Sequence, residues 1–340
     1  MREKLKKLGI ELPLLPTTAV GSYPKPEQLL EARRMMLAGR LKPKDLRAME
    51  ERATRDWISL QEEIGLDVLV DGEMYRGDMA THFAENLDGF KISGLVRSYG
   101  NRYYRKPIIV GEVRWRGPIT VDWWKFAQGL TKKLVKGMIT GPYTMMDWSF
   151  NEYYPSRREA CLALARALHE EVKALAGAGA KIIQVDEPAI STRPEELQEF
   201  AIEAMKIVTK GVDAYFINHI CYGAFEFIYP GMLELPVDNF DLEMSNSELD
   251  LVELFREHPF TKDLSFGVVD VHSHVVEDIK TVKERIQRAL EVLRSEQLWI
   301  DPDCGLKTRT REEAIGKLQA MVNAAKEIRN SLKGAEGGPH

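Results

Sequence analysis

The sequence predicts an α/β protein that forms a single (β/α)8 barrel, also called a TIM barrel. Short apolar runs alternate with longer, charge-rich segments of helical periodicity along the 340-residue chain. Alternating β and α units predict a parallel sheet, and eight such units suggest that the sheet closes on itself. Because no Gly/Ser-rich linker or low-complexity segment interrupts the alternation, we expect one domain over residues 1–340, with its core at 16–330.

The expected strands are short apolar runs followed by polar residues, and the helices lie between them. In chain order the strands are Thr17–Ser22, Asp67–Asp71, Gly137–Thr140, Lys181–Val185, Ala214–His219, Asn239–Glu243, Ser265–Val271 and Leu298–Asp301. The clearest helices are Arg157–Ala176, Pro194–Thr209, Leu249–Arg256, Ile279–Leu293 and Arg311–Leu332.

Two insertions are expected after the first two strands. Pro24–Gln61 has a helical pattern, and Thr81–Asp122 contains the run Ile108–Trp115, which predicts a small hairpin that caps the barrel. Gly334–His340 is expected to be a frayed tail.

The composition indicates a cytoplasmic protein that binds neither nucleic acid nor membranes. The net charge is −5 and charges of both signs are interspersed, so no basic surface is expected for nucleic acid or anionic lipid. Three cysteines without a regular framework favour a reducing compartment, where thiols can bind metal. The first 16 residues make a poor signal peptide, and no apolar run is long enough to span a membrane.

Polar and ionisable residues stand at the carboxyl ends of nearly all the expected strands. In this fold the active site is built there, from the loops that follow the strands. The residues are Ser22, Glu73, Asp186, Glu187, His219, Cys221, Glu243, Asp270, His272, Asp303 and Cys304. A barrel that served only as a scaffold would not need them, so their joint position predicts a functional site.

Two of the three cysteines indicate a metal centre. His219 and Cys221 are two residues apart on an extended chain and therefore point to the same side, while Cys304 ends a later strand at the same rim. One imidazole and two thiolates form a zinc ligand set, and an exchangeable fourth position would make the centre reactive. Cys161 lies at helical spacing in an apolar segment and is expected in the core.

Glu243 and His272 each allow two interpretations. Glu243 could complete a tetrahedral zinc site as an oxygen ligand or cap the helix that follows, although Ser245 and Ser247 are better caps. His272 and His274 form a His-x-His pattern that is also found in metal-dependent hydrolases. Those enzymes carry it on the first strand, whereas here it follows the seventh.

Seven blocks of sequence resemble the cobalamin-independent methionine synthase family, specifically its catalytic C-terminal barrel. They occur in the family's order, which makes the resemblance specific. The blocks are Val20–Pro24, Asp71–Met79, Gly141–Ser149, Gln184–Ala189, His219–Tyr222, Asp270–Ser273 and Pro302–Arg309.

The resemblance implies that one Zn²⁺ per chain is held by His219, Cys221, Glu243 and Cys304. The enzyme would transfer a methyl group to the thiol of L-homocysteine and so make L-methionine. Further residues are implied for homocysteine: Ser22 with the backbone of Val20 and Gly21 for its carboxylate, and Glu73 and Asp186 for its ammonium group. 

The same resemblance assigns residues to the methyl donor. His272 resembles the family's acid group, which would protonate the leaving nitrogen of a folate, and Asp270 would orient the ring. Trp148 matches the position on which the pterin of the folate stacks, and Arg102 lies in a segment that aligns with a folate-contacting loop. 

Two departures bear on the donor. The usual enzyme has a second barrel that helps to bind the folate's polyglutamate tail, and this sequence does not contain that barrel. The family also usually has cysteine where Tyr103 stands. The chain therefore resembles the short, archaeal-type core enzymes, for which a protein-bound methyl-corrinoid and 5-methyltetrahydrofolate are both plausible donors. 

Two other functions remain open. Relatives of the family alkylate coenzyme M, but its sulfonate would suit a basic pocket better than the acidic pair Glu73 and Asp186. A structural zinc protein would require a closed site, which the polar groups at the strand ends speak against.

Overall fold

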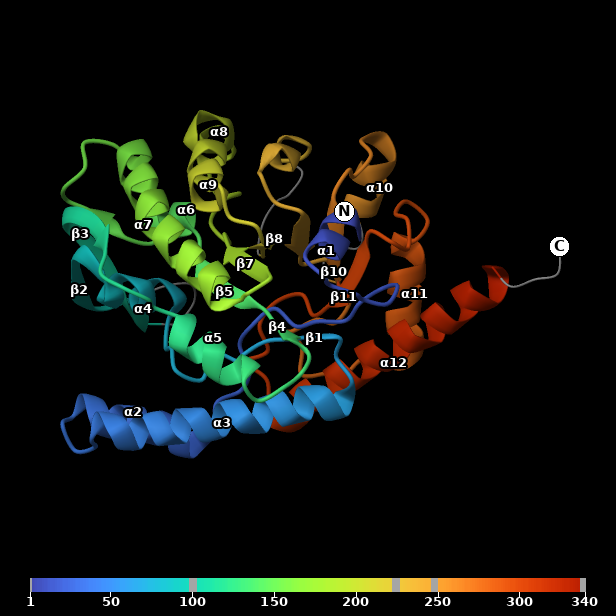
Figure 1. Ribbon diagram of the computed structural model, residues 1–340, viewed down its shortest axis with the longest axis horizontal. Helices are drawn as coiled ribbons and strands as arrows, with labels where there is room; N and C mark the ends of the chain where they lie inside the picture. The colour runs from blue at the N-terminus through green and yellow to red at the C-terminus, as the bar shows by residue number, and fades with distance from the viewer. Residues whose placement is uncertain (1, 98–102, 222–226, 246–249, 337–340) are drawn as a thin grey trace. The chain divides into compact units, whose positions relative to one another are not determined.

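The computed structural model describes residues 2–97, 103–221, 227–245 and 250–336 (Figure 1). Its internal contacts divide the chain into two compact units. One comprises Met1–Tyr75, Lys125–Lys136 and Asp241–His340, and the other comprises Arg76–Trp124 and Gly137–Phe240. Helix α5 (Val121–Gln128) and strand β9 (Asn239–Leu242) each contain a boundary between the two.

The first unit carries the longest helix. Its elements are α1 (Arg2–Lys7), α2 (Glu27–Leu37), α3 (Pro43–Ile64), β1 (Val68–Leu69), β4 (Leu134–Val135), α10 (Asp250–Glu257), β10 (Asp263–Gly267), α11 (Ile279–Ala289), β11 (Leu298–Asp301) and α12 (Arg311–Glu336). Helix α3 begins with a proline and ends at Gly65, whose φ of 95° suits the left-handed residue that stops a helix. Helix α3 packs against α12 (Figure 1), and Arg311 of α12 lies over the ring of the buried Trp57.

The second unit carries the hairpin insertion and three central strands. Its elements are α4 (Met79–Asn86), β2 (Leu87–Arg97), β3 (Tyr103–Trp115), β5 (Gly137–Thr140), α6 (Pro142–Asp147), β6 (Phe150–Asn151), α7 (Arg157–Ala178), β7 (Ile182–Asp186), α8 (Pro194–Glu196), a π-helical turn (Leu197–Ala201), α9 (Ile202–Thr209), β8 (Tyr215–Ile220) and a 3₁₀ helix (Gly231–Glu234). Helix α7 starts where the Ser156 side chain accepts a hydrogen bond from the Glu159 N–H, and it packs on α9.

The central sheet confirms the α/β fold class. Six strands pair in the order β5-β7-β8-β9-β10-β11, and every residue in them is buried. The pairings with recorded register, β5–β7, β7–β8 and β10–β11, are all parallel. A parallel sheet buried on both faces requires continuous apolar strands with helices outside, which is the pattern that the sequence showed.

The expected first strand does not form as a regular strand. Thr17–Ser22 forms isolated bridges only at its ends, from Thr17 to Ile300 and from Ser22 to Gly72. The carbonyl of Thr17 also accepts hydrogen bonds from Asp67 and Val68 N–H, next to the parallel pair of β1 with β4. The pairing thus continues from β11 through Thr17 to β1 and β4, as in an eight-stranded parallel barrel.

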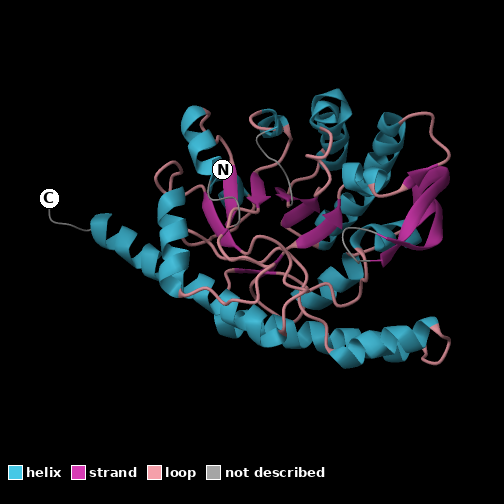
Figure 2. Cartoon of the chain, turned by 180° about the vertical axis from the view of Figure 1, so that it is seen from behind, coloured by secondary structure: helices cyan, strands magenta, loops and turns pink. Residues whose placement is uncertain are grey.

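The hairpin insertion is larger than the sequence indicated. The run Ile108–Trp115 is only the second half of β3, which pairs antiparallel with the full length of β2 (Figure 2). Strand β2 was missed because most of its side chains are only partly buried, so no period-2 hydrophobic pattern marks it. A register shift at Gly89 requires glycine, because a Cβ there would lie 2.6 Å from the Glu112 carbonyl oxygen.

Three helix predictions need correction. Pro194–Thr209 is broken by the π-helical turn into α8 and α9, and Ile279–Leu293 ends earlier, at Ala289. Helix α12 continues to Glu336, so residues 334–336 are helical rather than frayed; 337–340 lie outside the described residues.

Glu171 of α7 anchors the end of the hairpin insertion. Its fully buried carboxylate accepts hydrogen bonds from Trp115 Nε1 at 2.9 Å, from the Ile119 and Thr120 N–H groups at 2.8 Å, and from the Thr120 hydroxyl at 2.8 Å. Glu171→Ala should lower the free energy of unfolding by roughly 3–6 kcal/mol, because buried donors lose a charged acceptor. Urea denaturation measures this loss.

Glu170→Ala is the matched control for this prediction, because the neighbouring Glu170 side chain is 43% exposed and pairs with Lys173 on the helix surface. It should change stability by no more than about 0.5 kcal/mol. Equal effects of the two substitutions would show that Glu171 is not an anchor.

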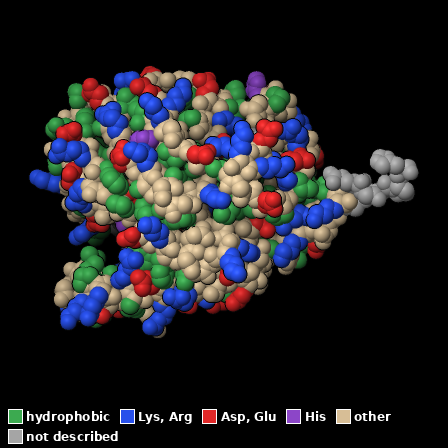
Figure 3. All heavy atoms as spheres, viewed as in Figure 1, with side chains coloured by type: hydrophobic (Ala, Val, Ile, Leu, Met, Phe, Trp, Pro, Cys, Tyr) green, Lys and Arg blue, Asp and Glu red, His purple; other side chains and the backbone are tan. Residues whose placement is uncertain are grey.

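The surface agrees with the balanced composition. On the face that Figure 3 shows, acidic and basic side chains are intermixed, without a broad region of one sign. Among the described residues, no helix has the length and apolar character needed to cross a membrane.

Candidate active site

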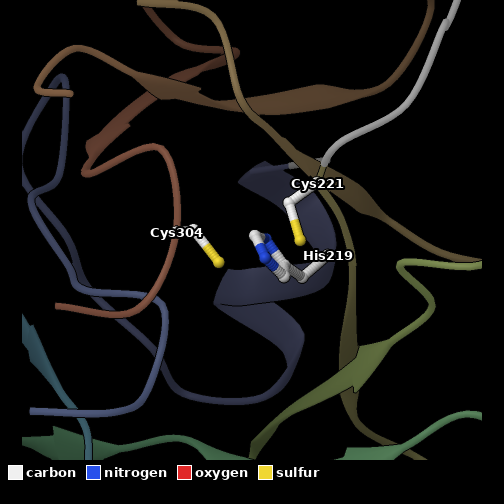
Figure 4. Close-up of side chains that lie close together, drawn as sticks. All are labelled: His219, Cys221 and Cys304. Atoms are coloured by element: carbon white, nitrogen blue, oxygen red, sulfur yellow. The ribbon is translucent and has the colours of Figure 1, made fainter. Parts of the chain in front are cut away.

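The structure brings three of the four predicted metal ligands together. His219 lies in the fully buried strand β8, Cys221 follows that strand, and Cys304 follows β11. Their ligand atoms lie within 4.8 Å of one another, and Figure 4 shows both sulfur atoms directed toward the imidazole ring. Ligand atoms on one zinc ion are roughly 4 Å apart, and an imidazole with two thiolates is a zinc donor set, so these residues fit that metal.

The third cysteine is separate from this group. Cys161 is fully buried in α7, and burial raises the pKa of its thiol well above the usual value. The three cysteines are all among the described residues and form no disulfide.

Glu243, the fourth predicted ligand, lies outside the group of three and beside His272. Its Oε1 atom is 3.4 Å from His272 Nε2, and the two side chains are 13% and 34% exposed. The sequence predicted roles for both residues but not their contact. A carboxylate at this position can orient the imidazole by accepting a hydrogen bond from one of its ring nitrogens.

Asp303 connects the segments that carry Glu243 and Cys304. Its carboxylate accepts hydrogen bonds from Met244 N–H at 3.1 Å, from Ser245 N–H at 2.9 Å and from the Ser245 hydroxyl. Burial raises the pKa of Asp303 to about 7, while the hydrogen bonds from Ser245 oppose that rise. The end of β9 is therefore tied to the residue next to Cys304. Ser245, which the sequence offered as a helix cap, donates its hydroxyl to Asp303.

Ser22, predicted to bind a carboxylate, lies against the loop that follows Cys304. Ser22 is 6% exposed, and its carbonyl oxygen accepts a hydrogen bond from Leu306 N–H at 2.7 Å. A Cβ at Gly305 would lie only 2.1 Å from Ser22 Oγ, so a larger residue there would force the Ser22 hydroxyl to move. Val20 and Gly21, also predicted to bind the substrate, precede Ser22 and are buried.

Glu73 has an unusual backbone conformation. Its φ is 58°, directly after Gly72 at 79°, and its N–H donates to Asp71 Oδ1 at 2.8 Å. Left-handed φ values are uncommon for residues other than glycine and are concentrated at functional sites. Ser22 forms a β-bridge with Gly72, and Glu73 is the next residue after Gly72.

Asp186 ends strand β7 and has two polar neighbours that the sequence reasoning missed. Its Oδ1 accepts a hydrogen bond from Gln184 Nε2 at 2.7 Å, and its Oδ2 is 4.0 Å from Arg76 Nη2. Gln184 could have been found, because residues i and i+2 of a strand point to the same side. Arg76 is 1% exposed, and only tertiary structure reveals its position.

Trp148 follows a helix that Glu187 fixes in place. The Glu187 carboxylate accepts hydrogen bonds from Tyr143 N–H at 3.0 Å and from Thr144 N–H at 2.7 Å, in the first turn of α6. Burial raises the pKa of Glu187 to about 7 against these hydrogen bonds. Trp148 caps the other end of α6 and is half-buried, whereas Arg102 lies outside the described residues.

These observations define a class of protein: an α/β enzyme with a parallel sheet and a thiol–imidazole group that could hold a metal ion at the strand ends. Residues 15–327 match the model of the cobalamin-independent synthase catalytic domain. The chain belongs to this family, which makes it a methyltransferase of methionine biosynthesis.

Relatives and solved structures agree with that assignment. The methionine synthase of Saccharolobus solfataricus is 42% identical over 324 residues, which cover 95% of this chain and 97% of the relative. That of Sulfolobus acidocaldarius is 39% identical, with 95% of each chain covered. A B12-independent methionine synthase from Shewanella sp. W3-18-1 in complex with selenomethionine has a TM-score of 0.84 at 27% identity, covering 94% of this chain and 99% of that one.

Proposed function

We propose that this enzyme uses a bound zinc ion to transfer a methyl group to the thiol of L-homocysteine, producing L-methionine. The observation that carries the proposal is the compact group of His219, Cys221 and Cys304 in a chain of this family. The printed name of the relatives, methionine synthase, supports the same acceptor. We also propose that the chain works as one domain, and that it does so in the cytoplasm, where thiols stay reduced.

His219, Cys221 and Cys304 would hold one zinc ion per chain, with Glu243 as an oxygen ligand that yields to a stronger one. When bound, zinc would lower the pKa of the homocysteine thiol so that it reacts as a thiolate. Two cysteine thiolates and one carboxylate outweigh the charge of the metal ion by about one unit, which favours a nucleophilic sulfur. 

Ser22 and Asp186 would orient the rest of the amino acid. The Ser22 hydroxyl, with the backbone of Val20 and Gly21, would hold the homocysteine carboxylate. Glu73 and Asp186 would accept hydrogen bonds from its ammonium group, a charge-assisted contact that a neutral thiol compound would not make. 

In the transfer, an electron pair of the homocysteine sulfur forms the new S–CH₃ bond while the bond between the methyl group and its donor breaks. With 5-methyltetrahydrofolate, the electron pair of the broken C–N bond goes to the leaving nitrogen, and His272 would supply a proton to that nitrogen. With a methyl-corrinoid, cobalt keeps the pair and needs no proton. Trp148 and Arg102 would contact the folate.

The donor is decided by methionine formation from L-homocysteine with zinc-loaded protein, comparing methylcobalamin with polyglutamylated 5-methyltetrahydrofolate. Turnover with either donor supports the proposal, and the His272→Gln variant should slow only the folate reaction. Absence of methionine with both donors, together with alkylation of coenzyme M, would refute homocysteine as the acceptor.

Gly305→Ala should weaken homocysteine binding without removing zinc. The added Cβ would clash with Ser22 Oγ, and moving that hydroxyl should raise the KM for homocysteine by roughly 10-fold or more. Steady-state kinetics and zinc content measure the two effects separately. Gly177→Ala is the control, because a Cβ there meets no atom within 4 Å. A normal KM for Gly305→Ala would remove Ser22 from the site.

A further inference from the structure

The loop that carries His272 is held by buried contacts that the proposed methyl transfer does not use. This loop, residues 270–278, joins β10 to α11 and begins with a tight turn. Asp270 Oδ1 accepts hydrogen bonds from His272 N–H at 2.7 Å and from Ser273 N–H at 3.3 Å. Asp270 therefore fixes the backbone at His272.

Glu277, near the other end of the same loop, links Asp270 to helix α12. One carboxylate oxygen, Oε1, accepts a hydrogen bond from Asp270 N–H at 2.6 Å, and the other, Oε2, lies 2.8 Å from Lys317 Nζ. The Glu277 side chain is only 8% exposed. Arg285 adds a second positive charge, with Nη1 at 3.6 Å from Glu277 Oε1 and at 2.7 Å from the Val268 carbonyl oxygen.

Lys317 of α12 is the most buried charge in this network. Its side chain is 0% exposed, and its ammonium group donates to the Val275 carbonyl oxygen as well as to Glu277. Lysine is almost never fully buried unless it is paired, because removing an ammonium group from water is costly. Both partners lie in the loop, so the buried ammonium group of Lys317 holds the loop against α12.

Further contacts place the loop along one face of α12. His274 Nδ1 lies 2.8 Å from Glu313 Oε1, one helical turn before Lys317. A Cβ at Gly316 would lie 3.0 Å from Val276, so the loop packs closely on the helix at that point. The loop is thus tied to α12 at residues 313, 316 and 317.

We propose that Lys317 and Glu277 are positioning residues: a buried clamp that holds the loop so that His272 keeps its place beside Glu243. His272 Nε2 and Glu243 Oε1 are 3.4 Å apart, a contact that requires the loop to stay in one conformation. This inference rests on the proposed role of His272 in the folate-dependent transfer. Whether these two residues hold the loop in place can be tested without measuring turnover.

The test compares Lys317→Met with wild-type full-length protein by hydrogen–deuterium exchange and by kinetics. We expect amide exchange in residues 270–278 to accelerate by roughly tenfold or more, because the buried anchor is lost. In folate-dependent turnover, kcat should fall roughly 10- to 100-fold through misplacement of His272, while zinc content and the KM for homocysteine stay within about twofold. Glu277→Gln, which keeps an oxygen for Asp270 N–H, should shift both measurements in the same direction.

Lys283→Met is the matched control. Lys283 and Glu327 form an exposed ion pair between α11 and α12 at 2.7 Å, away from the loop, so its loss should change neither measurement. Unchanged exchange at residues 270–278 in both clamp variants, or an equal rise throughout α11 and α12, would overturn the clamp. If wild-type protein shows no methyl transfer, the proposed function fails, and the exchange measurement still decides whether the clamp exists.

Discussion

Replacing Cys304 with serine should remove tightly bound zinc and abolish methionine formation. Serine keeps the size of the side chain but replaces the thiolate with a hydroxyl, which is a far poorer zinc ligand at neutral pH. Loss of residues that merely support a metal ligand weakens metal binding 10- to 100-fold, so loss of a ligand should weaken it by at least about 100-fold. Competition with a zinc-binding dye measures the affinity, and a methionine assay measures the activity.

Cys161→Ser is the matched control for this experiment. Cys161 is a buried residue of α7 outside the thiol–imidazole group. Its substitution should reduce stability slightly and leave zinc affinity within about twofold of wild type. Full zinc retention by the Cys304 variant would remove Cys304 from the ligand set and with it the basis of the proposed mechanism.

Asp186→Asn should weaken homocysteine binding without affecting zinc. The amide can still accept the hydrogen bond from Gln184, but its NH₂ group would replace the oxygen that lies 4.0 Å from Arg76. The substrate ammonium group would then lose a charged acceptor, so the KM for homocysteine should rise about 10- to 100-fold. 

Glu195→Gln provides the comparison for this substitution. It neutralises an exposed carboxylate in α8 and should leave the KM unchanged. If Asp186→Asn lowered the zinc content as well as raising the KM for homocysteine, the residue would support the fold of the site rather than bind the ammonium group.

Residues at strand ends were the most predictable part of the site. His219 and Cys221 could be placed because a buried apolar run precedes them and their spacing of two puts them on one side of a strand. Cys304 could be joined to them because the carboxyl ends of parallel strands share one rim. The alternation of apolar and charged segments likewise predicted a parallel sheet, and six of the eight expected strands pair in the central sheet.

Contacts between distant side chains were not predictable. Arg76 near Asp186, and Lys317 beneath the His272 loop, are charged residues that local patterns place on the surface. Their burial depends on partners that are 110 and 40 residues away, so it is decided by tertiary packing. Strand β2 was missed for a different reason, since its partly buried side chains leave no alternating pattern.

The central claim is that homocysteine sulfur joins zinc held by His219, Cys221 and Cys304. Zinc X-ray absorption spectroscopy of the loaded protein, recorded before and after addition of L-homocysteine, tests it most directly, because sulfur neighbours at about 2.3 Å can be counted. Our account predicts two sulfur neighbours before the addition and three afterwards. An unchanged count of sulfur neighbours with bound homocysteine would contradict it.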